Sequence, residues 1–266
     1  MTRSVISLLI VLGGTSAYAK LEIGNIQAAY GEVGPARSSL VYYPGDEILF
    51  RYMLTGVQTN DKGEVDIDIA FRLTDAKGHI LLDKTTPAKA IAAFAGGCLP
   101  GSARATLGET LPPGIYRLRV VAKDKLSGDT ASFEREVTFK ATTFTSISQR
   151  FFLDADRKVP SGASGIVGQT LHFRIGVIGF DRSKGRIETR MDLEILDEKG
   201  KEVLARPLKA GYKNEEADSV KEVSLVNFDG FVTLNRVGSF RLRFNFTDVV
   251  GSQNSRFEVP FHVTEP

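Results

Sequence analysis

The chain has 266 residues, of which 42% are hydrophobic and 25% are charged, so it is long and apolar enough to bury an ordinary core. Its 34 basic and 32 acidic residues leave a net charge of +2, which gives no basis for binding nucleic acid or an anionic membrane. A single cysteine excludes a disulfide within the chain, so each domain must be held by its hydrophobic core.

The N-terminal residues 1–19 have the pattern of a cleavable signal peptide. A basic start precedes an apolar run from Val5 to Gly14, and Ala17 and Ala19 supply the small residues of a cleavage site. The run is too short to span a bilayer, which takes roughly 20 apolar residues. We therefore expect cleavage after Ala19, export to the periplasm or out of the cell, and a mature protein that does not span the membrane.

The rest of the chain is an internal repeat of two domains, 20–140 and 141–266. Three blocks recur in the same order, and each has the alternating hydrophobic residues that are typical of a strand. The matched blocks are Gly45–Arg51 with Gly168–Arg174, Val65–Leu82 with Ile187–Leu204, and Gly114–Arg119 with Gly238–Arg243. The shared order indicates that the two domains share one fold.

Turn residues separate these strands in both copies. The second block contains an Asp-x-Lys-Gly turn that ends at Gly78 or Gly200, where glycine permits a positive φ. Asp124 and Asp248 recur at the last hairpin, and we expect them to cap backbone N–H groups. Short strands with such turns predict an all-β protein of two tandem antiparallel β-sandwiches.

A family resemblance rests on the last hairpin. Pro113–Val120 and the following Asp124–Gly128 resemble the late hairpin of immunoglobulin-like or fibronectin-type domains in exported bacterial proteins. The second copy, Gly238–Asp248, is similar but lacks the proline pair. The mature chain as a whole resembles uncharacterised exported bacterial proteins with two such sandwiches. This resemblance implies immunoglobulin-like domains and export, and it implies no activity or site residues.

Two local features have competing interpretations. Cys98 is either a buried small residue, which we favour, or the partner in an intermolecular disulfide. The Ala-rich segment Ala88–Ala95 is a candidate helix, but its flanking glycines and Pro87 favour a loop or a single turn.

Residues that usually form catalytic or metal sites are scattered along the chain. No histidine has a second histidine or cysteine at metal-ligand spacing, and neither a Gly-x-Ser-x-Gly elbow nor a phosphate-binding glycine loop occurs. Asp66 and Asp68 share one outward face, which leaves a weak calcium site as the alternative to a solvated face. The sequence therefore predicts no enzyme, no catalytic or cofactor-binding residues, no cofactor and no metal.

Four residues are candidates for contact with a partner. Tyr42 and Tyr43 form an aromatic pair that is either exposed or packed on its own domain. Arg51 and Arg174 occupy equivalent outward positions, where they either mark a recognition face or lie among acidic neighbours. We favour the second interpretation for the arginines.

These observations favour a non-catalytic structural or protein-interaction module of the cell envelope or secreted space. One alternative is a carbohydrate-binding protein, which must rely on tyrosines because the chain has no tryptophan. Another is a two-domain periplasmic assembly chaperone, which offers a strand edge to its partner. The expected partner is therefore an envelope or extracellular protein, or a polysaccharide. The copies diverge most at Ala88–Ala105 and Lys209–Lys221, where we expect specificity.

Overall fold

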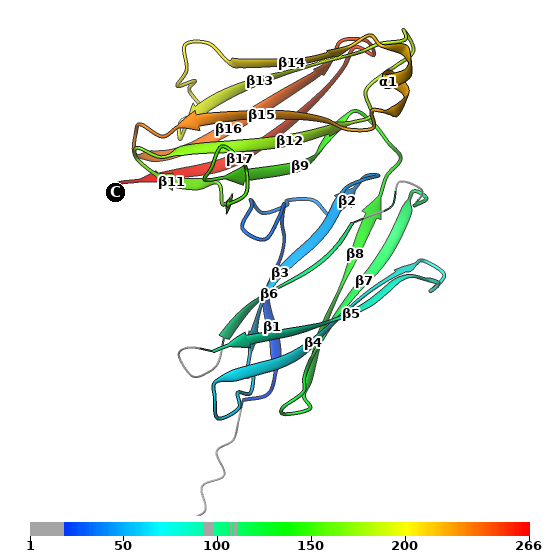
Figure 1. Cartoon of the computed structure of the whole chain (residues 1–266), viewed down its shortest axis with the longest axis vertical. Coiled ribbons are helices and arrows are strands. Elements are labelled where there is room, and N and C mark those ends of the chain that lie inside the picture. Colours follow the sequence, from blue (N-terminus) through cyan, green and yellow to red (C-terminus); the bar gives the residue numbers. More distant parts are fainter. Residues whose placement is uncertain (1–18, 93–97, 107, 109–110) are drawn as a thin grey trace, which may run out of the picture.

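The computed structural model describes residues 19–92, 98–106, 108 and 111–266. The predicted signal peptide lies outside the described residues apart from Ala19. In the part that is described, no helix is long and apolar enough to cross a membrane. Strands dominate and build two β-sandwiches, which follow one another along the long axis of the molecule (Figure 1). The all-β prediction is confirmed.

The N-terminal sandwich packs a three-stranded sheet against a five-stranded sheet. The smaller sheet has the order β1 (Glu22–Ala28), β3 (Glu47–Thr55), β6 (Cys98–Thr106). The larger sheet has the order β2 (Val41–Tyr42), β8 (Thr130–Phe139), β7 (Gly114–Asp124), β4 (Glu64–Asp75), β5 (Ile80–Ile91). Strand β6 lies near β4, so β5 and β6 are the edge strands on one side of the sandwich.

The C-terminal sandwich repeats this order. One sheet runs β10 (Pro160–Ser161), β9 (Thr145–Phe152), β12 (Thr170–Ile178), β15 (Val226–Thr233). The other runs β11 (Ser164–Ile166), β17 (Gln253–Thr264), β16 (Gly238–Asp248), β13 (Ile187–Asp197), β14 (Leu208–Asn214). A short helix, α1 (Ala217–Glu222), connects β14 to β15. The strands β14 and β15 therefore correspond to β5 and β6. The predicted division after residue 140 falls between β8 and β9.

Alternating side chains explain why these segments form half-buried strands. Most of the predicted inward residues of β4 and β12 are buried: Val65, Ile67, Phe71, Leu73, Leu171, Phe173, Ile175 and Val177. Between them, Arg72 faces solvent. The C-terminal core is rich in phenylalanine, and the rings of Phe173 and Phe244 meet edge-on with their centroids 5.1 Å apart. The two sheets of each sandwich thus meet through the predicted faces.

Two repeated aspartates connect the last hairpin of each sandwich to a distant loop. Asp124 is fully buried, and its carboxylate accepts hydrogen bonds from the backbone N–H groups of Leu126 and Gln58, each at 2.8 Å. Asp248 is also fully buried and accepts from the N–H groups of Val250 at 3.1 Å and Asp181 at 2.8 Å. The predicted capping is confirmed. In each sandwich the second bond also reaches a loop that is distant in sequence, and charge-assisted hydrogen bonds of this kind are strong.

Three local features differ from the sequence-based expectations. Cys98 is exposed, because it begins an edge strand in which Ala103 and Ala105 occupy the inward positions. The segment that we expected to be a loop or single turn is a strand as far as Ile91, where pairing with β4 outweighs local propensity; residues 93–95 lie outside the described part. Helix α1 was not expected from the sequence, because six residues are too few to show a helical period; its buried Val220 packs against the C-terminal core.

A buried ion pair lies at the end of the N-terminal sandwich that faces the C-terminal one. Both nitrogens of the Arg37 fork donate to the Asp46 carboxylate, and the two side chains are only 4% and 2% exposed. The guanidinium also lies over two aromatic rings, 4.6 Å from the centroid of Tyr30 and 4.1 Å from that of Tyr42. It further donates to the Val41 carbonyl. The ion pair, the two ring contacts and the backbone hydrogen bond together fix the segment between β1 and β3, which we call the β1–β3 loop.

The β1–β3 loop and the start of β3 also contact the C-terminal sandwich. The Tyr30 ring meets the Phe257 ring of β17 edge-on, with centroids 5.8 Å apart. Glu47 lies 3.9 Å from Arg150 of β9, and the buried Gln149 lies beside the same loop. The two sandwiches are therefore joined by packed side chains as well as by the chain itself.

We expect Arg37→Met to destabilise the protein by about 3–5 kcal/mol, because it leaves the buried Asp46 carboxylate without a counter-charge. Arg37→Met combined with Asp46→Leu should recover most of this loss. The measurement is urea unfolding of the purified protein. Arg72→Met is the control, since the Arg72–Asp83 pair is largely exposed and contributes about 1 kcal/mol or less. Equal effects of Arg37→Met and Arg72→Met contradict the prediction.

Candidate binding site

The predicted aromatic pair is not an exposed platform. Tyr42 is fully buried in the N-terminal core beneath Arg37, and Tyr43 is half-buried. Burial raises the pKa of Tyr42 to about 12, so its hydroxyl stays protonated at neutral pH. Tyr42 therefore packs on its own domain, which is the second of the two arrangements that the sequence left open.

The two predicted arginines bind their own strand neighbours. Arg174 makes two hydrogen bonds of 2.8 Å to the carboxylate of Asp229 on β15, and these bonds hold the pKa of Asp229 below its usual value. Arg51 donates to the Gly34 carbonyl at 3.0 Å and to the Gln27 side chain. The structure places Arg51 and Arg174 in different sandwiches, so it does not bring them together.

The paired carboxylates of β4 face a lysine. The Lys125 ammonium lies 3.0 Å from Asp66 and 2.9 Å from Asp68. Across the described residues, no group of three or more histidine, cysteine, aspartate or glutamate side chains has the arrangement of a metal site. This face therefore consists of mixed, partly solvated charges.

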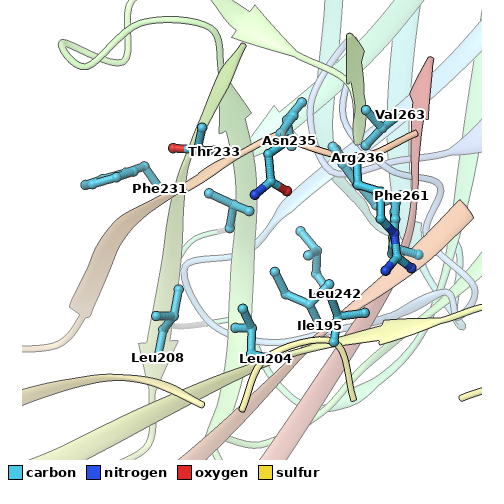
Figure 2. Close-up of a pocket in the computed structure, with 14 residues that line it drawn as sticks. Ile195, Leu204, Leu208, Phe231, Thr233, Asn235, Arg236, Leu242, Phe261 and Val263 are labelled. Carbon is cyan, nitrogen blue, oxygen red and sulfur yellow. The ribbon is translucent and has the colours of Figure 1, made fainter. Parts of the chain in front are cut away.

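A deep apolar groove opens between the two sheets of the C-terminal sandwich, which sequence reasoning did not identify (Figure 2). We call it the sheet-edge groove, and its volume is about 520 Å³. It is lined by Ile195, Val203, Leu204, Leu208, Phe231, Val232, Thr233, Leu234, Asn235, Arg236, Phe240, Leu242, Phe261 and Val263. This size lies within the roughly 300–1,000 Å³ that is usual for ligand pockets.

Residues from both sheets form the walls of the groove. Its floor reaches the core, since Leu242 and Val263 are buried. Figure 2 shows Leu204 and Leu208 on the side opposite Thr233. Leu208 is 44% exposed, so the mouth of the groove presents apolar surface to solvent. Such surface is costly to leave in water at about 25 cal/mol per Å².

Polar groups gather at one end of the groove. Asn235 and Arg236 follow the end of β15, and the Arg236 guanidinium lies 5.2 Å from the centroid of the Phe240 ring. Arg236 forms no ion pair within the part of the chain that the structure describes. The groove therefore combines an apolar floor with the positive charge of Arg236 at one end.

The N-terminal sandwich differs from the C-terminal one at the place that corresponds to the groove. There the position of Phe240 is taken by Tyr116, whose hydroxyl donates to the Pro112 carbonyl, and Leu111 packs against the core. The connection from β6 to β7 is also longer than the one from β15 to β16. The missing proline pair of the second copy was therefore the sequence signal for this difference.

Comparisons with known proteins assign no family. No protein-family model and no curated protein matches the chain. Among solved structures, the C-terminal domain of Streptococcus pyogenes AspA, an antigen I/II-family protein, has a TM-score of 0.31 and 10% identity over 92% of this chain and 100% of that one. The C-terminal domain of the Streptococcus agalactiae antigen I/II polypeptide BspA has a TM-score of 0.29 and 8% identity, covering 91% and 99%.

Red sea bream transglutaminase is also similar, with a TM-score of 0.30 and 8% identity over 93% of this chain. The chain spans only 32% of that enzyme. Likenesses this distant carry no argument about activity or partners.

We expect the anionic apolar dye anilinonaphthalene sulfonate to bind the native groove, because its rings match the floor and its sulfonate matches Arg236. Leu208→Arg and Arg236→Glu should each reduce the fluorescence enhancement. Leu81→Arg is the matched control, since Leu81 is 45% exposed near the start of β5, the counterpart of β14. A titration in which Leu81→Arg has the larger effect contradicts the assignment.

Proposed function

We propose that the protein is an exported, non-catalytic interaction module of the cell envelope or secreted space, and that the sheet-edge groove holds an apolar segment of a protein partner. One observation carries the proposal: the C-terminal sandwich has an apolar groove between its sheets, and two of the side chains that line it, Leu208 and Phe231, are 44% and 60% exposed. Exposed apolar surface beside a preformed cavity is typical of a binding site.

The groove lining supports binding rather than catalysis. Its polar members are Thr233, Asn235 and Arg236, and it contains no carboxylate, histidine or cysteine. These residues offer hydrogen bonds and a fixed positive charge, and they supply no general base at neutral pH. The polysaccharide alternative relied on an exposed aromatic pair, and the burial of Tyr42 removes that support.

The residues just after the proposed cleavage point belong to the N-terminal sandwich. Leu21 is 2% exposed and belongs to the N-terminal core, and the Lys20 carbonyl lies against Gly56. The chain therefore packs into the N-terminal sandwich from Lys20 onward, which is compatible with cleavage after Ala19.

A photo-cross-linking residue at Leu208 should capture a specific protein in the native host. The same residue at Leu81 is the control, because both positions are leucines of equal exposure in equivalent strands. Covalent products are identified by mass spectrometry, and capture should be lost when Leu204→Arg is added. Products that are identical at both positions, or an absence of protein products at Leu208, contradict a protein partner in the groove.

The exported protein should begin at Lys20, because signal peptidase cuts after the small residue at the end of its recognition site. Intact-mass measurement of the protein from the periplasm and from the medium tests this and decides between the two locations. Replacing Ala17 and Ala19 with lysine should leave an uncut precursor. A full-length mass for the wild-type protein in the cytosol contradicts the proposed export.

A further inference from the structure

We propose, on the basis of the function proposed above, that the partner segment binds as an extended strand added to the free edge of β15, with alternate apolar side chains in the groove and an acidic side chain paired with Arg236.

The first argument is that β15 ends its sheet. It pairs with β12 from Thr170↔Thr233 to Val177↔Val226, and the order of the sheet places no described strand on its other side. An edge strand presents a row of unpaired N–H and C=O groups, which a further strand can use.

The second argument is a difference between the two sandwiches. On the N-terminal open side, each edge contains a proline, since Pro100 of β6 pairs with Met53 and Pro87 of β5 pairs with Asp68. A proline has no N–H to donate, so in an edge strand it faces away from the neighbouring strand and interrupts any strand added there. The N-terminal edges are thereby blocked.

The C-terminal edges contain no such block. The position equivalent to Pro100 is Asn227, which pairs with Gly176 as Pro100 pairs with Met53. In an antiparallel pair, the N–H and C=O of one residue both point toward the neighbouring strand, and those of the next residue both point away. Phe231 and Thr233 lie four and six residues after Asn227, so their N–H and C=O groups point away from β12 as those of Asn227 do. Their backbone groups therefore face the free edge beside the groove.

The other C-terminal edge is less suitable. Strand β14 carries Lys209 and Lys213, and edge lysines oppose strand addition. Only Leu208, its first residue, lines the groove. Strand addition is therefore assigned to β15.

The shape and charge of the groove define the added strand. A strand added beside Thr233 runs alongside β15 over the groove, and Figure 2 shows Leu204 and Leu208 on the opposite side. Alternate side chains of such a strand point to one face, so every second residue enters the apolar floor. Arg236 lies at one end of the groove and forms no ion pair with any residue that the structure describes, so its charge selects an aspartate or glutamate.

The test uses a phage-displayed library of short random peptides, selected on the wild-type protein and counter-selected on Leu208→Arg. Enriched peptides should alternate apolar and polar residues and carry an acid near one end. Absence of enrichment, or enriched peptides without alternation, overturns the proposal.

The best peptide is then tested by fluorescence polarisation. N-methylation of the backbone nitrogens that face β15 should weaken binding by about tenfold or more, because it removes strand pairing without removing side chains. Arg236→Glu should weaken the acidic peptide similarly and favour its lysine variant, whereas Leu81→Arg should change nothing. Equal binding of the methylated and unmethylated peptides overturns strand addition.

Phe231→Pro removes one edge N–H of β15, and Pro100 shows that this type of edge tolerates proline. Because Phe231 also lines the groove, Phe231→Ala is the control for loss of the ring, and only a larger effect of proline counts for strand addition. Circular dichroism checks the fold of the proline variant. Protein capture at Leu208 with no effect of N-methylation or Phe231→Pro refutes strand addition and leaves the proposed function standing. Absence of both protein capture and peptide binding refutes both.

Discussion

An open β-sandwich leaves unpaired strand edges on one side, and the two sandwiches of this protein differ in the residues that occupy those edges. Backbone groups at an edge remain available to any other strand, which makes edges both binding sites and aggregation risks. The N-terminal sandwich interrupts its edges with Pro87 and Pro100. The C-terminal sandwich has no proline in β14 or β15 and leaves a groove between its sheets. One scaffold thus occurs in a protected and an open form.

Buried polar anchors keep this scaffold in register. Asp124 and Asp248 hold equivalent turns to equivalent loops, which explains why both copies retain an aspartate there. The Arg37–Asp46 pair occurs in the first copy alone, at the end that meets the second sandwich. Side-chain packing at that junction joins the two sandwiches.

Several features could be predicted because they depend on local chemistry. Alternating side chains placed the inward faces of β4 and β12, and Gly78 and Gly200 adopt the positive φ that their turns require. Other predictions failed for want of information about neighbours. Tyr42 is buried because an arginine stacks on it, and Cys98 is exposed because its strand lies at an edge with that side chain outward.

The sequence by itself determined the strands, the turns and the repeated order of two β-sandwiches, because a period of two and glycine turns are properties of adjacent residues. The tertiary structure decided which strands are edges, which aromatic residues are covered and where the core opens. Those features depend on the packing of distant segments, such as β14 and β15, which bring Leu208 and Phe231 into the lining of one groove. A groove between sheets is a property of that packing, and no local pattern encodes it.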